Sequence, residues 1–192
     1  MTAFPLPPGQ LLTVAEYAAL GEDDQYRWEL QEGSLVMSPR PSTRHMLASG
    51  ELLYQLKSQL PRGVRVIPDV DLDLQLASPD RPGWARRPDL ILVDQGAIDR
   101  VKSEGGLLRA EEVHLVVEIV SPTSRRMDYV IKRGEYADAG IPHYWILDLD
   151  APVSLLPLHL AGDLGYADDG ELTGTVTTVQ PYPVTINLDQ LN

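Results

Sequence analysis

Apolar and polar residues alternate with recognisable periods along the first third of the chain. Residues 13–16, Thr-Val-Ala-Glu, form a capping box in which Glu16 reaches back to Thr13, so a short helix is expected from there to about Leu20. Residues 26–31 and 34–38 are extended runs around Glu-Gly, a hairpin signal. A long amphipathic helix is expected from near Ser42, because apolar residues then recur at helical spacing before a proline. Those apolar residues are Met46, Leu53, Leu56 and Leu60.

The middle of the chain reads as strands separated by loops. Strands are expected at residues 64–67, 70–76 and 88–93, and loops at 78–87 and 94–111, where Pro, Gly and polar residues accumulate. Residues 113–120 are the most strand-like run, apolar on both faces except for Glu118. A run that is apolar on both faces is typical of a strand in the centre of a sheet.

The last third combines one helix with further strands. Residues 126–139 read as a helix that Gly140 ends, and residues 143–149 as a strand. Short extended runs follow from Val153, so residues 153–192 are expected to form an antiparallel β extension. The order predicts an α/β or α+β protein with a mixed central sheet flanked by helices.

Length and composition narrow the classes of protein. The 192 residues suit a single domain, with a Pro-rich and loosely ordered segment at residues 1–12. The absence of cysteine excludes disulfides, thiolate zinc sites and a cysteine nucleophile. No secretory signal or membrane-spanning stretch is evident, which favours a cytoplasmic protein without a membrane partner. Neither a serine-hydrolase nucleophile motif nor a phosphate loop occurs.

The net charge of −12 is unfavourable for binding nucleic acid, because phosphate contacts require Lys and Arg. All 16 basic residues nevertheless lie within the first 133 residues, against 19 acidic ones. Arg87, Arg125 and Arg126 stand beside the motifs described next, so they could form a local positive rim that contacts nucleic acid. An acidic protein with no polyanionic partner is the alternative that charge alone favours.

Two carboxylates stand in apolar strands. Asp89 opens the run Asp-Leu-Ile-Leu-Val, and Glu118 lies within Val-Val-Glu-Ile-Val. A buried carboxylate without a partner is costly, and two of them in adjacent strands can share a hard cation. Mg²⁺ needs only one or two carboxylates together with water and substrate phosphate, and Mn²⁺ is the alternative ion. Asp89 and Glu118 are therefore the expected metal ligands of a site that hydrolyses phosphodiesters.

A third group of residues lies on the helix after the Glu118 strand. Asp128, Lys132 and Tyr136 are spaced four apart and share one helix face, so Lys132 could offer a cation to the developing charge or orient the attacking water.

Structural alternatives exist for each of these residues. Asp89 could end a turn, and Glu118 could form a buried ion pair with Arg125 or Lys132. Lys132 could pair with Asp128 or Glu135 on a solvated face, and Tyr136 could serve packing alone.

The joint pattern resembles a known family. Pro-Asp89, the strand residue Glu118, then SPTSRR with Asp128, Lys132 and Tyr136, then AGIPHYWILD, resemble the Uma-two family of restriction endonucleases. That family belongs to the PD-(D/E)XK nuclease superfamily. The upstream segment WELQEGSLVMSPRPSTRH is similar to the family's Glu-x-x-x-Gly hairpin, which a Ser-Pro-x-Pro-Ser run and a His follow.

The resemblance implies a restriction-endonuclease-like fold, a Mg²⁺-dependent endonuclease acting on DNA, and a homodimer. By resemblance, Asp89 and Glu118 match the metal-binding acids, and Glu29 and His45 match recurrent positions near the cleft. The superfamily Lys lies two residues after the strand acid, where this chain has Val120; the Uma-two family carries it on the next helix, which Lys132 matches. The alternatives are a catalytically degenerate protein that binds nucleic acid or regulates on the same fold, and a structural or partner-binding protein.

Overall fold

The structure is a computed structural model, and it describes residues 9–21, 26–38 and 40–191. Four α-helices, one π-helical segment and short 3-10 turns accompany fourteen strands in these ranges. The helical elements are α1 Val14–Ala19, α2 Thr43–Lys57, α3 Gln95–Glu104, η1 Ala110–Glu112, η2 Met127–Lys132, α4 Arg133–Asp138, η3 Gly162–Leu164 and η4 Leu188–Leu191. The strands are β1 Arg27–Gln31, β2 Ser34–Ser38, β3 Val64–Pro68, β4 Leu72–Asp73, β5 Ala85–Arg86, β6 Leu90–Asp94, β7 Leu108–Arg109, β8 Val113–Val120, β9 His143–Asp148, β10 Ser154–Leu160, β11 Tyr166–Asp168, β12 Leu172–Thr173, β13 Thr175–Thr178 and β14 Val184–Asn187.

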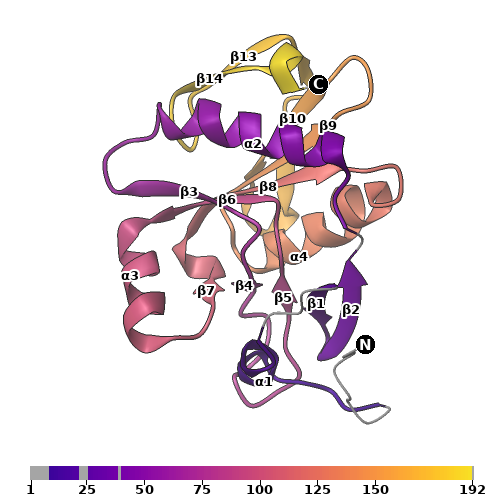
Figure 1. The fold of residues 1–192 in the computed structure, drawn as a ribbon, viewed down its shortest axis with the longest axis vertical. Helices are drawn as coiled ribbons and strands as arrows, with labels where there is room; N and C mark the ends of the chain where they lie inside the picture. Colours follow the sequence, from indigo (N-terminus) through magenta and orange to yellow (C-terminus); the bar gives the residue numbers. More distant parts are fainter. Residues whose placement is uncertain (1–8, 22–25, 39, 192) are drawn as a thin grey trace.

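A mixed sheet forms the centre of the protein, with the order β11-β10-β9-β8-β6-β3 and β12 paired with β10 (Figure 1). The pair β8 and β9 is parallel, and the other pairs along this path are antiparallel. The crossover from β8 to β9 runs through η2 and α4, as a parallel pair requires. The prediction of a mixed sheet with flanking helices is confirmed.

Side chains alternate between the two faces of this sheet and pack into two separate hydrophobic cores. Leu115, Val117 and Ile119 of β8 pack beneath α2, together with residues of β14 and η4. Val116 and Val120 point to the opposite face, where they pack with Tyr136 of α4. Glu118 alternates onto this second face, so the α4 side of the sheet carries the charged residue.

A second sheet with the order β2-β1-β5-β4-β7 lies below the first in Figure 1, and α1 packs near it. The predicted capping box of Thr13 and Glu16 is present. The hairpin turn at Glu32-Gly33 needs positive φ at both residues, and a Cβ on Gly33 would come within 2.6 Å of Pro82 Cβ. Leu12 N donates to Gly33 O at 2.8 Å, which fixes the entry to α1, while residues 1–8 of the segment expected to be loosely ordered lie outside the described residues.

The C-terminal residues form the expected antiparallel β extension. β10 adds to the central sheet beside β9, and the hairpin of β13 and β14 lies above α2 in Figure 1. Gln55 of α2 and Gln59 just after its C-terminal end bind this hairpin: Asn187 N donates to Gln55 Oε1 at 2.8 Å, and Thr185 N donates to Gln59 Oε1 at 2.9 Å.

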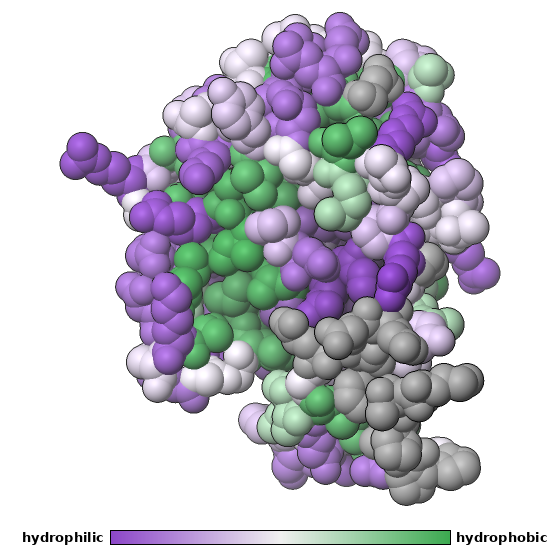
Figure 2. Space-filling view, viewed as in Figure 1, coloured by the Kyte–Doolittle hydropathy of each residue, from purple (hydrophilic) through white to green (hydrophobic). Residues whose placement is uncertain are grey.

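One of the two edges of the central sheet is β3. Partly buried apolar side chains reach the surface on both sides of this strand, among them Leu53, Leu60, Val66 and Ile67. Figure 2 shows the resulting apolar area below α2, framed by hydrophilic groups. None of the helices in the described ranges has the length and apolar character that crossing a bilayer requires.

Several expectations about single elements are wrong. Residues 94–111 are not a loop, because α3 covers the sheet with Ala97, Ile98 and Val101, and β7 follows. The expected strand at residues 70–76 shrinks to β4, because Asp69 and Gln75 adopt positive φ on either side of it.

Three further details differ from expectation. The expected loop at residues 78–87 contains β5, whose two residues pair with β1 and β4. Met46 is exposed, because α2 turns Ala48, Leu52 and Leu56 toward the sheet instead. The expected helix at residues 126–139 begins as the π-helical η2 before α4.

Candidate functional site

The register of two antiparallel strands brings the predicted acids together. Leu90 of β6 pairs with Val117 of β8, and Ile91 pairs with Val116. Continued by one residue, this register places Asp89, which directly precedes β6, opposite Glu118. Alternation along β8 turns the Glu118 side chain to the α4 face, and the Asp89 carboxylate reaches the neighbouring Ile119 N–H. Both carboxylates are buried, and both line the same cavity.

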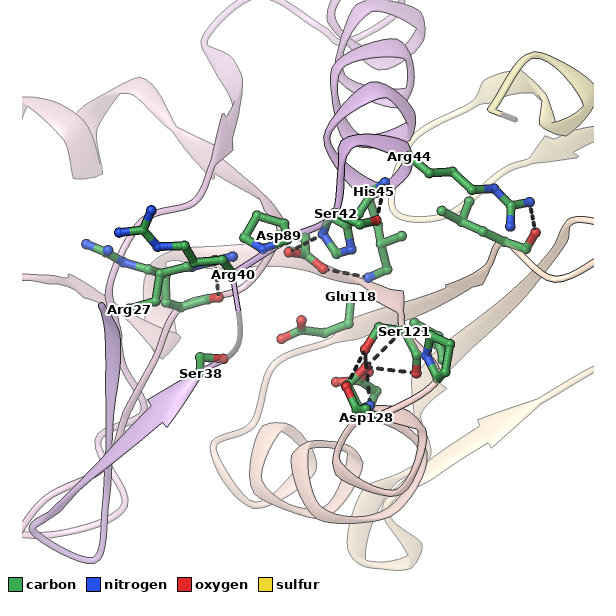
Figure 3. Close-up of a pocket in the computed structure, with 18 of the residues that line it drawn as sticks. Arg27, Ser38, Arg40, Ser42, Arg44, His45, Asp89, Glu118, Ser121 and Asp128 are labelled. Atoms are coloured by element: carbon green, nitrogen blue, oxygen red, sulfur yellow. Dashed lines mark hydrogen bonds and ion pairs between the residues drawn. The ribbon is translucent and has the colours of Figure 1, made fainter. Parts of the chain in front are cut away.

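Hydrogen bonds to both of its oxygens fix the Asp89 carboxylate. Ile119 N donates to Oδ2 at 2.7 Å, and His45 Nε2 lies 2.8 Å from Oδ1 (Figure 3). His45 stands in the first turn of α2, where its own N–H donates to the N-cap hydroxyl of Ser42 at 3.2 Å. The helix N-cap therefore positions the imidazole, and the imidazole orients the carboxylate.

Glu118 receives two short hydrogen bonds on one oxygen. Lys132 Nζ lies 2.8 Å from Oε1, and the Tyr136 hydroxyl donates to the same atom at 2.6 Å. Burial raises the pKa of Glu118 to about 8 even though Lys132 opposes the shift, and the negative charges of neighbouring acids, Asp89 first among them, raise it further. Glu118 therefore lies in a buried position among three other acids, Asp89, Asp128 and Glu29, and beside one ammonium group.

The π-helical segment η2 supplies two of the charged groups. Asp128 is the second residue of this segment and Lys132 the last, and both side chains are buried. Burial raises the pKa of Asp128 to about 6, against the lowering effect of Lys132. Burial alone would lower the pKa of Lys132, but Glu118, Glu29 and Asp128 hold it above its ordinary value. The single-turn π-helix is a feature often found at functional sites.

Glu29 connects Lys132 to a fully buried arginine. Its Oε1 lies 3.4 Å from Lys132 Nζ, and its Oε2 lies 3.0 Å from Nη1 of Arg86. Arg86 also forms a bidentate pair with Glu135, at 2.7 Å from Nε and 2.6 Å from Nη2. Although burial alone would raise the pKa of Glu29, Lys132 and Arg86 hold it below its ordinary value. The network therefore holds the ammonium group through Glu29, and neither Glu29 nor Arg86 lines the cavity.

The cavity measures about 320 Å³ and opens beside these groups. Figure 3 shows Asp89 and Glu118 next to each other, with His45 above them and Asp128 beside the Ser121 turn. Val120, two residues after Glu118, also lines the cavity but carries no charge. Lys132 approaches Glu118 from η2 and places its ammonium 2.8 Å from Oε1.

Of the arginines predicted to contact nucleic acid, Arg87 alone lines this cavity, and its guanidinium pairs with Asp71 at 3.0 Å. Arg125 lies outside the lining, half-exposed over the Tyr129 ring and paired with Asp148. Arg126 is exposed and also lies outside it.

Three arginines that the prediction missed line the cavity instead. They are Arg27 of β1, Arg40 of the connecting segment and Arg44 of α2. In the sequence Arg40 and Arg44 lie among prolines and polar residues, and Arg27 lies far from them. Only the folded chain brings β1, with Arg27, beside the start of α2 (Figure 3).

The residues present fit a hard divalent cation. No group of three or more acidic or histidine side chains in the described ranges forms a ready-made metal cage. Mg²⁺ does not need one, because it keeps several waters and binds through one or two carboxylates. Asp89 and Glu118 supply such an oxygen pair, and a bound cation would offset the burial that raises the pKa of Glu118.

Comparisons with known proteins agree with this architecture. No curated protein matches the chain. Among solved structures, a crystal structure described as a "putative nuclease belonging to DUF820" from Anabaena variabilis superposes with a TM-score of 0.66, at 15% sequence identity, over 94% of this chain and 97% of that one. The likeness supports the fold. The sequence model of the Uma2 family, described as "Putative restriction endonuclease", matches residues 14–166. The chain therefore belongs to the Uma2 family.

Proposed function

We propose that this protein is a metal-dependent endonuclease that hydrolyses phosphodiester bonds in DNA, with Mg²⁺ or Mn²⁺ as cofactor. The observation that carries the proposal is the convergence of Asp89 and Glu118 on one cavity, with Lys132 Nζ 2.8 Å from Glu118. Membership of a family described as "Putative restriction endonuclease" agrees with it.

Asp89 and Glu118 would hold the ion. A divalent cation bound there would supply Lewis-acid polarisation of the phosphate and a lower pKa for water. His45 and the Ile119 N–H orient the Asp89 carboxylate, so it does not have to reorganise when the substrate binds. Both hydrogen bonds that described residues give to Glu118 end on Oε1, which leaves Oε2 for the cation.

Lys132 would act on the phosphate through its charge. The ammonium lies 2.8 Å from Glu118, 3.4 Å from Glu29 and 3.9 Å from Asp128. Held between these three acids, it is preorganised as a cation for the charge that develops on the phosphoryl oxygens. Tyr136 would keep Glu118 in place through its 2.6 Å hydrogen bond.

The rim of the cavity supports an anionic substrate. Arg27, Arg40, Arg44 and Arg87 all line it, although the chain carries a net charge of −12. Arginine binds phosphate oxygens in a bidentate manner, so a local cluster of this kind suits a nucleic-acid backbone. A homodimer acting on the two strands of a duplex is part of the same proposal.

A non-hydrolytic role on the same fold is the second candidate, and one observation favours it. The Lys132–Glu118 contact is also the buried ion pair expected of a structural site, and position 120 carries Val rather than Lys. Such a protein would bind DNA without cutting it.

Cleavage of supercoiled plasmid tests the proposal. The wild type is expected to nick or linearise plasmid with Mg²⁺ or Mn²⁺ and to leave it intact with EDTA. Asp89→Asn and Glu118→Gln are expected to abolish cleavage, since each removes a charged ligand of the ion. Glu112→Gln is the matched control, because Glu112 accepts a bidentate pair from Arg100 and does not line the cavity.

Calorimetric titration of Mn²⁺ separates the two candidates. A nuclease is expected to bind the ion in the wild type and to lose that binding in Glu118→Gln. The titration is repeated with Mg²⁺. A wild type that binds neither Mg²⁺ nor Mn²⁺, with DNA affinity retained in Glu118→Gln, contradicts the nuclease proposal and favours the binding protein.

A further inference from the structure

The solvent face of α2 is built around a glycine. Gly50 lies near the middle of this 15-residue helix and is exposed. Three large apolar side chains surround it, with exposed fractions of 57% for Met46, 64% for Leu47 and 72% for Tyr54. The single acidic residue of α2, Glu51, is only partly exposed and accepts a hydrogen bond from Gln55 at 3.0 Å. A contiguous apolar face of this kind is typical of an interaction surface.

Gly50 has no visible function within its own chain. A Cβ built on it meets no atom within 4 Å among the described residues, and its φ is not in the positive range that favours glycine. Glycine in the interior of a helix is less favourable than alanine. Its presence at an open position is explained if another backbone approaches closely at this point.

The residues around Gly50 are arranged symmetrically along the helix. Met46 and Tyr54 lie four positions before and after it, and Leu47 and Leu53 lie three positions before and after. All four lie on or next to the solvent face, and the partly buried Leu53 also lies beside Leu60 and Val66 at the β3 edge. A helix with this pattern is complementary to a second copy of itself that runs in the opposite direction.

We propose that two copies of this chain associate through α2, with the helices antiparallel and crossing at Gly50. Met46 then packs against Tyr54 of the partner subunit, and Leu47 packs against Leu53 of the partner subunit. The thioether of methionine makes favourable contacts with aromatic rings. The interface is isologous, so the same contacts form twice around a two-fold axis.

A second copy fits this face better than nucleic acid does. The central turns of the helix present apolar groups, whereas a surface for phosphates would present basic ones. The basic residues Arg44 and Lys57 lie toward the two ends of the helix. A stable interface buries about 800 Å² on each partner, and one helix face supplies only part of that. The dimer is therefore expected to be weak and dependent on concentration.

The proposal does not depend on hydrolysis, but it places the two sites relative to each other. His45, which holds Asp89, lies five residues before the crossing point, about 7.5 Å along the helix axis. The two cavities would therefore lie close to the two-fold axis, one on either side of it.

Because the chain has no cysteine, single cysteines test the geometry directly. Met46→Cys and Tyr54→Cys chains, one of them tagged, are mixed under mild oxidation. The mixture is expected to crosslink about tenfold faster than either chain alone, because the interface holds the two cysteines at high effective concentration. Position 46 and its symmetry mate would lie about 12 Å apart along the axis, beyond the reach of a disulfide. A mixture of Val130→Cys with Tyr54→Cys is the control, since Val130 is 62% exposed on η2.

Sedimentation of Gly50→Leu tests the close approach. The wild type is expected to move from the 21.2 kDa chain mass toward twice that mass as concentration rises. Gly50→Leu is expected to remain at the chain mass with a thermal midpoint no lower than the wild type, because leucine favours helix and fills open space. The proposal is refuted if the wild type stays monomeric, if each cysteine variant crosslinks alone as fast as the mixture, or if Gly50→Leu still dimerises. Loss of DNA affinity in Gly50→Leu, with the oligomeric state unchanged, would assign the face to nucleic acid instead.

Discussion

The buried guanidinium of Arg86 allows a prediction about stability to be worked through from the structure. Its side chain is 0% exposed and makes three charge-assisted hydrogen bonds, two to Glu135 and one to Glu29. Replacement by Met fills much of the same volume but leaves both carboxylates without this partner. Removing one member of a buried ion pair costs about 3–5 kcal/mol.

The surroundings of the two acids place Arg86→Met near the lower end of that range. Glu135 is 13% exposed and can be partly hydrated, and Glu29 keeps Lys132 and the Arg87 N–H. The expected loss is therefore about 3 kcal/mol. For a chain of this length each kcal/mol lowers the thermal midpoint by about 2–4 °C, so a decrease of about 6–12 °C is expected.

Thermal unfolding followed by circular dichroism measures this shift. Arg109→Met is the matched control, because its pair with Glu111 is 3.8 Å long with side chains 43% and 63% exposed. An exposed pair of this kind is worth about 0–1 kcal/mol. Adding Glu135→Gln to Arg86→Met is expected to restore part of the loss, because it removes the carboxylate left unpaired. A thermal midpoint of Arg86→Met within 2 °C of the wild type, which corresponds to a loss below about 1 kcal/mol, would show that the network does not carry the stability assigned to it. A double variant no more stable than Arg86→Met would show the same.

Three further predictions follow from single contacts. His45→Ala frees one oxygen of Asp89 and is expected to weaken Mn²⁺ binding about 10–100-fold by calorimetry, whereas His45→Asn should restore part of it; equal affinity in all three proteins would remove the orienting role. Tyr136→Phe removes the hydroxyl donor to Glu118 and is expected to cost about 1–3 kcal/mol in urea unfolding; an unchanged unfolding midpoint would contradict the buried hydrogen bond. Gly33→Ala places a Cβ 2.6 Å from a proline Cβ at positive φ, so it should destabilise by about 1–3 kcal/mol, and a neutral result would mean that the turn can relax.

The sequence predicts most reliably the elements whose apolar pattern is imposed by burial on both faces. Residues 113–120 are expected as a central strand, and β8 has these limits because it lies between two strands and two cores. The prediction of a loop at residues 94–111 is wrong for the opposite reason. Only Ala97, Ile98 and Val101 of α3 touch the core, so polar residues and glycines dominate the local pattern and conceal the helix.

The candidate site follows the same logic. Asp89 and Glu118 stand out because a charge in an apolar strand demands a partner, and Lys132 stands out by its helical spacing with Asp128 and Tyr136; the structure brings all three together. Arg86 does not stand out, since it sits in a polar loop pattern and its partner Glu135 lies 49 residues away. Pairing over such a distance depends on how the second sheet packs against α4, which no local spacing reveals.

The π-helical turn of η2 determines where the Lys132 ammonium lies in space. The wider turn carries an extra residue, and omitting one residue between 127 and 132 would rotate everything after it by about 100°, which would swing the amine away from its acids. Under the proposed function the ammonium reaches the strand acid from the helix, so β8 does not need the short Glu-x-Lys signature. A nuclease with this arrangement would escape searches for that signature, and would be recognised by comparing where its charged atoms lie in three dimensions.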